Sequence, residues 1–444
     1  MNGIIVKDLR ELDVVPPEYI RRVESDLSSY LPKAEQIINA VRERGDEALI
    51  GYGKQLDRVS AETFSLRVTP EEFDAAQSAV SPEIKAAISY AADNIRRFHE
   101  AQMPQGMWLK EIRPGAFAGE RCVPIGTAAC YVPSGIGSFP SVLMMTTTPA
   151  VVAGVPRIVV ITPPGPDGKV DAATLVAAQA AGVEEIYKCG GAQAIAAVAY
   201  GTQSVPRCSK VVGPGSPWVS AAKQLVRDVI DTGISAGPSE CVILADETAD
   251  GRLIALDLAI ESERGRDSSA YLVTTSPEVA HLAAKSLAEN LLTMTSCPRA
   301  QSSRAVLSGP YGGILLVKNL DTAIRFVNDY APEHLQVHTA EPMALLGRIT
   351  NAAEVLLGPF TSVGISSFVL GPNAVLPTCR HARTTSPLNV HDFIKRISFG
   401  YVTADGYAQL AQHAEVLARY EGFIGHANAG FADRVAQVHR TAIQ

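Results

Sequence analysis

The sequence predicts an α/β protein built on parallel sheets, and three observations lead to that prediction. The 444 residues are 47% hydrophobic, 19% charged and only 6% aromatic, a composition that suits strands buried on both faces. From about Tyr131 onward, short β-rich runs alternate with helical segments of about ten residues, which is the pattern of βαβ units. The chain is also too long for one compact core, so we expect two or three domains.

The first hundred residues are expected to be helical. Between positions 17 and 105, apolar residues recur at i, i+3 and i+4 with charged residues between them, as in amphipathic helices. Thr69 offers a helix N-cap, and Pro70 with the two acids after it suits a first helical turn. The alternation of strands and helices begins at about Tyr131, and from about Ser386 the chain is expected to be helical again.

Turns rich in glycine and proline follow the predicted strands, as in TPPG, CGGA and GPGS. Parallel sheets bind ligands at the carboxyl ends of their strands, so these turns are candidate ligand contacts. The GPGS turn, 213–216, stands between a strand and a helix and could hold a pyrophosphate on backbone N–H groups. It is not the G-x-G-x-x-G fingerprint, and glycine at strand ends commonly serves the turn alone, so both interpretations stay open.

The overall charge and the cysteines limit the partners and the compartment. Lys and Arg number 39 against 46 Asp and Glu, a net charge of −7, which argues against nucleic acid or an anionic membrane as a partner. None of the seven cysteines forms a C-x-x-C pair, as is typical of reduced thiols in a cytoplasmic protein. No signal-peptide layout opens the sequence. The most apolar window, 142–164, is interrupted by Arg157 and four prolines, so we expect no membrane span.

The pair Glu333–His334, just after Pro332, is a candidate for chemistry. The glutamate could activate water while the histidine, with an ordinary pKa of about 6.5, relays the proton of a hydroxyl group. A structural salt bridge at a helix end is the alternative, and the dipeptide alone does not decide. His338 follows in a predicted strand, where the two histidines would lie roughly 13 Å apart and could not share a metal.

Two other segments concentrate charge. ESERGRD, 261–267, holds five charged residues among seven and is either a solvated loop or a ligand-binding segment. EGFIGH places Glu421 and His426 near the C-terminus, where such residues are commonly exposed.

Taken in order, these segments resemble the histidinol dehydrogenase family. The matching pieces run from about residue 120 to the C-terminus and include CYVPSGIGSFPSVLMMTTTPAVVAGVPRIVVITPP, GGAQAIAAVAYGTQSVPRCSKVVGPGSPWVSAAKQLV, AGPSECVILAD, YAPEHLQVH, GPNAVLPT, SPLNVHDFIKR and EGFIGHANA. The resemblance implies NAD-dependent oxidation of an amino alcohol to the acid in two steps. A Glu–His pair would supply base and acid, and in the family a zinc ion holds the substrate.

The resemblance also implies an architecture. An N-terminal segment, 1–25, would precede a first Rossmann-like domain made of 26–130 and 240–385. An NAD-binding Rossmann-like domain, 131–239, would be inserted into it. The helical tail, 386–444, would be swapped onto the partner in a homodimer, so that each site borrows residues from the other chain.

Carried over position by position, the resemblance assigns roles to twelve residues. Glu333 would activate the water and His334 would relay protons. The cofactor-binding residues would be Tyr131, Pro133, Gln193, Pro214 and Ser216, where Ser216 replaces the asparagine usual in the family. The substrate-binding residues would be Ser239, Glu261, Arg264, Glu421 and His426.

The departures concern the zinc ligands. Where the family has Gln-Ala-Glu-His, this chain has ESER, with Glu261 for the glutamine and Arg264 for the histidine. The family's Gly-Asp-Tyr is replaced by SVGISSFVLGPN, and another site histidine by Ala374. Of four expected ligands only His426 clearly survives. Zinc needs at least three protein ligands, and arginine cannot be one, so we expect no metal.

The sequence therefore predicts a zinc-independent NAD-dependent dehydrogenase of a small polar alcohol. A guanidinium at Arg264 would favour a carboxylate, sulfonate or phosphate on the substrate. The alternative is a non-catalytic ligand- or nucleotide-binding homologue that kept the fold and lost the reaction. The survival of Glu333, His334, Tyr131 and Gln193 argues against that alternative.

Overall fold

The computed structural model describes residues 4, 6–22, 26–62, 64–134, 137–234, 237–293, 298–428 and 434. The chain divides into two compact units, and each is considered on its own. The first unit comprises Met1–Gln102 and Gly126–Phe393, and the second comprises Met103–Ile125 and Ile394–Gln444.

The first unit contains a parallel four-stranded sheet whose strand order is β6-β5-β4-β7. Each strand leads into a helix, which is the βαβ pattern expected from the sequence. The strands are β4 (Thr127–Tyr131), β5 (Arg157–Thr162), β6 (Ile186–Lys188) and β7 (Lys210–Val212), and the helices are α5 (Pro140–Val152), α6 (Ala172–Ala181), α7 (Gly191–Tyr200) and α8 (Pro217–Val226).

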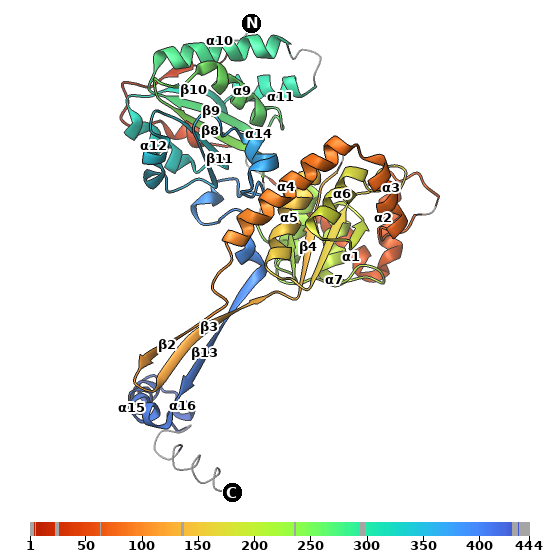
Figure 1. Ribbon diagram of the computed structural model, residues 1–444, viewed down its shortest axis with the longest axis vertical. Coiled ribbons are helices and arrows are strands. Elements are labelled where there is room, and N and C mark those ends of the chain that lie inside the picture. Colours follow the sequence, from red (N-terminus) through yellow and green to blue (C-terminus); the bar gives the residue numbers. More distant parts are fainter. Residues whose placement is uncertain are drawn as a thin grey trace. The chain divides into compact units, whose positions relative to one another are not determined.

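Four N-terminal helices form an outer layer around this sheet. They are α1 (Leu31–Arg44), α2 (Asp46–Gln55), α3 (Pro70–Ala79) and α4 (Pro82–Ala101). Helices α1 and α2 pack against α7, and α1 also packs against α8, while α3 and α4 pack against α6 and α4 against α5 (Figure 1). The predicted N-cap is confirmed, because Thr69 and Glu72 form a capping box at the start of α3.

The expected domain boundaries grouped residues 26–130 with 240–385, and the structure differs on this point. The helices before residue 102 pack on the helices of the four-stranded sheet, and strand β4 belongs to that sheet as well. An amphipathic pattern shows that one helix face is buried. It does not show which sheet buries it.

The second sheet of the first unit is parallel and six-stranded, in the order β1-β10-β9-β8-β11-β12. Strand β1 comes from the N-terminal segment, which the sequence analysis had set apart. The strands are β1 (Val6–Asp8), β8 (Glu240–Ala245), β9 (Ser269–Thr274), β10 (Gly312–Leu316), β11 (His334–His338) and β12 (Glu354–Leu357), and the long helices are α9 (Gly251–Ser262), α10 (Pro277–Thr293), α11 (Pro298–Leu307) and α12 (Leu320–Tyr330).

Both faces of this sheet are buried, since side chains alternate along each strand and a separate core covers each face. On β8, Cys241 and Ile243 pack into the core beneath α9 and α10, whereas Val242 and Leu244 pack on the opposite face with α12. Figure 1 shows α9, α10 and α11 on one side of the sheet and α12 on the other. The prediction of an α/β fold with parallel sheets is confirmed.

Short elements connect and follow these strands. They are η1 (Pro17–Ile20), α13 (Pro342–Leu345), η2 (Leu346–Arg348), α14 (Val363–Ile365), η3 (Ser366–Leu370), η4 (His381–Arg383) and η5 (Val390–Phe393). Among the residues that the structure describes, no helix is both long and apolar enough to cross a membrane.

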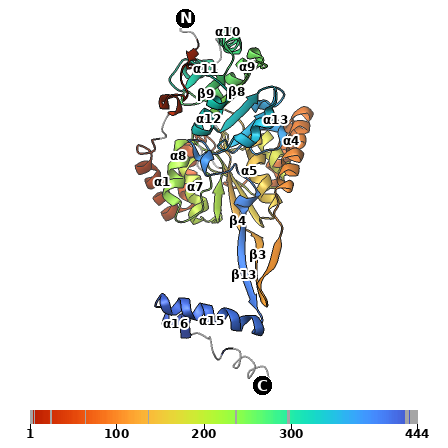
Figure 2. The same cartoon turned by 90° about the vertical axis from the view of Figure 1, so that its left-hand side faces the viewer.

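The second unit is a three-stranded antiparallel sheet in the order β13-β3-β2, followed by two helices. Figures 1 and 2 show α15 and α16 at one end of these strands. The tail was expected to be helical from about Ser386, but after η5 it continues as the nine-residue strand β13, whose partner β3 is remote in sequence. The elements are β2 (Met107–Arg113), β3 (Ala116–Pro124), β13 (Ile394–Val402), α15 (Ala404–Tyr420) and α16 (Ile424–Asn428).

Candidate active site

Glu333 and His334 lie at the amino end of β11. Helix α12 ends where Ala331 adopts a left-handed conformation, with φ 54°, and Pro332 cannot continue a helix. The strand register places His334 opposite Cys241 of β8 on one side and Glu354 of β12 on the other. The candidate catalytic groups therefore meet at the amino edge of the six-stranded sheet, not at the carboxyl edge where such sheets commonly bind ligands.

The imidazole of His334 is buried and held from one side by a carboxylate. Its Nδ1 lies 2.8 Å from Oε2 of Glu354, and Oε1 of Glu354 accepts a hydrogen bond from the Ser366 hydroxyl. An ionised carboxylate only accepts, so Nδ1 carries the proton. Nε2 lies 3.8 Å from Oε1 of Glu333 and 4.0 Å from Oε1 of Glu261, and no described residue gives it a hydrogen bond.

Glu333 is buried, and its Oε2 accepts a hydrogen bond from the backbone N–H of Glu240 at 2.9 Å. Burial raises the pKa of Glu333, and the nearby Glu261 carboxylate adds to the effect, although the charge of His334 opposes it. Burial lowers the pKa of His334, but Glu333, Glu261 and the bond to Glu354 outweigh burial, so the net shift is upward. A carboxylate with a raised pKa is a better base than an ordinary one near neutral pH.

Glu261, on the last turn of α9, faces the same space and pairs with Arg264. The Glu261 side chain is fully buried, and its Oε1 lies 3.2 Å from Nη2 of Arg264. The guanidinium also reaches the hydroxyls of Ser239 and Ser367, each at 3.5 Å. Neither oxygen of Glu261 makes a well-aligned hydrogen bond with a described residue.

The segment that replaces the family's Gly-Asp-Tyr takes part in this site. Ser366 binds Glu354 and Ser367 binds Arg264, and both serines lie in η3. Glu354, Ser366 and Ser367 were not predicted as site residues from the sequence. A lone glutamate in the run AAEVLLG gives no signal until the strand register is known.

The described residues contain one group of side chains that could hold a metal. Ligand atoms of Glu261, Glu333 and His334 all lie within 4.8 Å of one another. Three donors are the minimum for zinc, but the permanent charge of Arg264 already sits 3.2 Å from one of them and repels a divalent cation. The donor set therefore does not fit the family's zinc.

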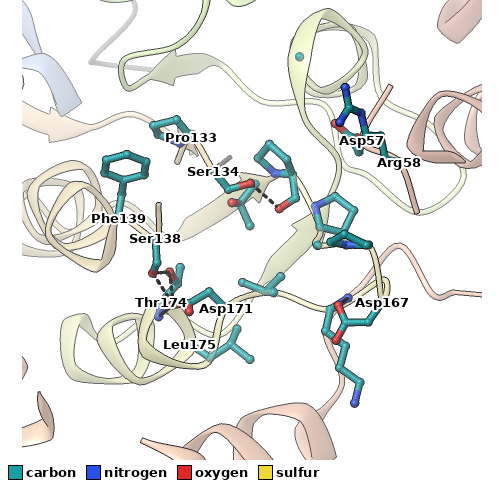
Figure 3. A pocket seen from close by; sticks show the side chains of 18 of the residues that line it. Asp57, Arg58, Pro133, Ser134, Ser138, Phe139, Asp167, Asp171, Thr174 and Leu175 are labelled. Carbon is teal, nitrogen blue, oxygen red and sulfur yellow. Dashed lines mark hydrogen bonds between the residues drawn. The ribbon is translucent and has the colours of Figure 1, made fainter. Parts of the chain in front are cut away.

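A cavity of about 1420 Å³ opens at the carboxyl ends of β4, β5 and β6 (Figure 3). Four predicted cofactor-binding residues line it, namely Tyr131, Pro133, Gln193 and Ser216; Pro214 is not among its described lining residues. The Tyr131 hydroxyl oxygen accepts a hydrogen bond from the Gly191 N–H at 3.1 Å. Size and position fit a dinucleotide at the carboxyl edge of a parallel sheet.

Asp57 and Asp171 are among the carboxylates that line this cavity, and neither was predicted from the sequence. Asp57 accepts a hydrogen bond from Nε2 of Gln193 at 3.3 Å, and burial raises its pKa to about 6 although hydrogen bonds from Gly190 and Gln193 oppose the shift. Asp171 binds the Ser138 hydroxyl at 2.5 Å (Figure 3). Oε1 of Gln193 is buried without a partner among the described residues, so it remains as an acceptor for a ligand N–H.

A second cavity, of about 1350 Å³, contains Ser239 and Arg264 in its wall. The start of α8 contributes to both cavities. Gly215, Pro217 and Ser220 line the second one, while Ser216 and Trp218 line the first.

The first unit thus brings together Glu333, His334, Ser239, Glu261 and Arg264. The other two predicted substrate residues, Glu421 and His426, belong to the second unit. Both are exposed there, and the His426 ring packs against the edge of Phe423 at 5.2 Å between ring centroids.

Comparison with known proteins agrees with this geometry. The family model for histidinol dehydrogenase matches residues 20–432. A histidinol dehydrogenase homologue from Mesorhizobium japonicum is 55% identical over 97% of this chain and 98% of its own. A histidinol dehydrogenase from Synechocystis is 46% identical over 92% and 94%. The crystal structure of histidinol dehydrogenase from Elizabethkingia anophelis covers 99% of both chains at 30% identity, with a TM-score of 0.89.

The fold and the site therefore define an oxidoreductase that acts on CH–OH groups. The chain belongs to the histidinol dehydrogenase family, whose members are NAD-dependent enzymes of this type.

Proposed function

We propose that this chain oxidises a small, polar, anionic alcohol with NAD and without zinc, and that it can take the product on to the acid. The observation that carries the proposal is the buried line Glu354–His334–Glu333, in which one carboxylate orients the imidazole and another faces its free Nε2. A structural ion pair would not need an unpartnered Nε2.

In the first oxidation His334 acts as the base. Nε2 takes the hydroxyl proton as the carbon loses a hydride, while the Nδ1–H group keeps its hydrogen bond to Glu354. NAD supplies the hydride acceptor. The alcohol thereby becomes an aldehyde, and one proton remains on the imidazole, where the surrounding carboxylates stabilise it.

In the second oxidation Glu333 acts on water. Its raised pKa suits a base that works near neutral pH, and its Oε2 is fixed by the Glu240 N–H. Glu333 takes a proton from water as the water oxygen bonds to the aldehyde carbon, and His334 returns its Nε2 proton to the aldehyde oxygen, which gives the hydrate. The unprotonated Nε2 then takes a hydroxyl proton from the hydrate as the carbon loses a second hydride, which gives the acid.

Arg264 takes over the place of a metal ligand and binds substrate instead. The guanidinium has five N–H donors, and the contact with Glu261 engages only one nitrogen. The Arg264 side chain is 39% exposed and lines the second cavity. These features support binding of an anionic group of the substrate.

The cofactor would be held in the first cavity. Tyr131, Pro133, Gln193 and Ser216 line it, and Gln193 offers a free acceptor. Ser216 caps the start of α8 in an extended conformation without a side-chain hydrogen bond, so its hydroxyl remains for the cofactor.

We further propose a cytoplasmic homodimer in which Glu421 and His426 complete the partner's site. None of the six described cysteines forms a disulfide, as expected for a reducing compartment. Helix α15 exposes Val416, Leu417 and Tyr420 at 65%, 61% and 90%. A contiguous apolar face of this kind favours association.

The test is direct. Purified protein is mixed with NAD and a panel of hydroxy compounds that carry carboxylate, sulfonate or phosphate groups, with uncharged analogues as controls, and NADH is followed by absorbance. NADH formation with a charged member supports the proposal. Tight NAD binding with no reduction across the panel would instead favour a ligand-binding homologue.

A further inference from the structure

The second cavity is strongly cationic. Its charged wall consists of Arg21, Arg22, Arg264 and Arg380 against Asp26 and Asp267. Two of these arginines already have carboxylate partners. Nε of Arg22 lies 2.5 Å from Oε1 of Glu240, and Nη2 of Arg264 lies 3.2 Å from Glu261.

The other two arginines, Arg21 and Arg380, form no ion pair with a described carboxylate. Asp329 is near Arg380. The Asp329 carboxylate lies 3.7 Å from Nη2 of Arg383 instead. Burial and the charges of Arg383 and Arg22 lower the pKa of Arg380. Like charges crowded at a cavity wall are relieved when an anion binds.

The backbone that carries Arg380 is in an uncommon conformation. Cys379 and Arg380 have φ of 55° and 66°, a left-handed region that residues other than glycine seldom adopt. Such backbone persists where the surroundings fix it, and it is concentrated at ligand sites. Here the N–H of Cys379 donates to Oε1 of Glu240 at 2.8 Å, and the N–H of Gly237 donates to Oγ1 of Thr378 at 2.5 Å.

These bonds tie Arg380 to the candidate catalytic residues. Glu240 accepts from Cys379 through its side chain and donates to Glu333 through its backbone N–H. Gly237 lies two residues before Ser239, whose hydroxyl accepts from Arg264. Arg264 and Arg380 are thus anchored to adjoining hydrogen-bonded segments and face one cavity.

We infer that Arg380 and Arg264 together form a subsite for a tetrahedral oxyanion, a phosphate or a sulfonate, on the substrate. The inference rests on the proposed function, because it names the chemical class of the anionic alcohol. One guanidinium can bind both coplanar oxygens of a carboxylate in a bidentate pair. A phosphate or sulfonate presents three oxygens in a tetrahedral arrangement, so an oxygen remains for a second guanidinium that approaches from a separate segment.

The experiment measures binding on the full-length protein loaded with NAD. Sulfate, phosphate and acetate are titrated at constant ionic strength by calorimetry, into the wild type and the variants Arg380→Met and Arg383→Met. Arg383 is the matched control, since it is three residues away, pairs with Asp329 and does not line the cavity. Arg380→Lys keeps the charge, and circular dichroism checks that each variant is folded.

We expect sulfate and phosphate to bind the wild type and Arg383→Met equally, and acetate at least about tenfold more weakly. Arg380→Met should weaken sulfate and phosphate by about tenfold or more, because charge-assisted hydrogen bonds are lost, and Arg380→Lys should recover part of it. Unchanged oxyanion affinity in Arg380→Met, an equal loss in Arg383→Met, or acetate binding as tight as sulfate would each overturn the inference.

This measurement separates the inference from the proposed reaction. If oxyanion binding depends on Arg380 but no alcohol yields NADH, the subsite is supported and the dehydrogenase activity is contradicted. If anionic alcohols yield NADH and Arg380→Met leaves the kinetics unchanged, the dehydrogenase activity is supported and the subsite is contradicted.

Discussion

Nδ1 of His334 lies 2.8 Å from Oε2 of Glu354, across the pairing of β11 with β12. The contact fixes one tautomer of the imidazole and leaves Nε2 to face Glu333 and Glu261. Glu354 is not among the described lining residues of either cavity, and besides His334 its carboxylate binds the Ser366 hydroxyl, so we expect it to act on the reaction through His334.

Replacement of this positioning residue should therefore affect rate more than binding. In Glu354→Gln we expect kcat to fall by about 10–100-fold, with KM nearly unchanged. The carboxylate raises the pKa of His334, so its loss should also move the acidic limb of the pH–rate profile to lower pH. The exposed Glu341→Gln is the control. A lower rate with an unmoved profile would mean that Glu354 is only structural.

Replacement of Glu333 and replacement of His334 should slow different steps of the reaction. Each is expected to contribute about 10²–10⁴-fold in rate. Glu333→Gln should slow the second oxidation most, because water loses its base, and His334→Ala should slow the first. Single-turnover NADH traces with alcohol or with aldehyde as substrate separate the two steps. Nearly full activity in a folded variant would return the pair to the role of a salt bridge.

Buried Asp257 should make the protein less stable as pH rises. Its carboxylate lies 3.6 Å from Nε2 of His338, and burial raises its pKa from 3.8 to about 6, although the nearby amide of Gln336 opposes the shift. An acid whose pKa is higher in the folded state contributes stability below its unfolded pKa, and this contribution is lost between about pH 4 and 6.

Asp257→Asn removes the free-energy cost of ionising this buried carboxyl group. We expect a gain of roughly 1–3 kcal/mol in the free energy of unfolding at pH 7 and little gain at pH 3.5. Urea denaturation at the two pH values measures the difference. An equal effect at both would show that packing, and not ionisation, controls this site.

Activity should not depend on zinc. Arg264 is held 3.2 Å from the carboxylate that would otherwise face the metal, so a tight divalent site is not expected. Dialysis against a strong chelator should leave the rate unchanged, and elemental analysis should find far less than one zinc per chain. One tightly held zinc, lost together with activity, would contradict this.

The proposed homodimer, in which the tail completes the partner's site, predicts complementation. Inactive Glu333→Gln and inactive His426→Ala are mixed and allowed to exchange subunits, so that a heterodimer has one site with both defects and one with neither. Activity should reappear. The matched control is Glu333→Gln mixed with His334→Ala, in which every site keeps one defect. If neither mixture regains activity although subunit exchange is demonstrated, each site is built from one chain.

Local patterns predicted the α/β class and the Thr69 cap because both depend on residues close in sequence. The Glu354–His334 contact and the β13–β3 pairing were not predictable in this way. They depend on strand register across 20 residues in one case and more than 250 in the other. The family resemblance located Glu333, His334, Tyr131 and Gln193, but it gave no role to the serines of η3, because those lie where this chain departs from the family.

The start of α8 belongs to the walls of both cavities, with Ser216 and Trp218 on one side and Gly215 and Pro217 on the other. If the binding of one ligand changes the arrangement of this segment, it also changes the surface that the other ligand meets. Thermodynamic linkage makes this coupling reciprocal. We therefore expect heterotropic cooperativity, in which saturation with dinucleotide changes the affinity for substrate by the same factor as the reverse, and a preferred order of addition in the steady state.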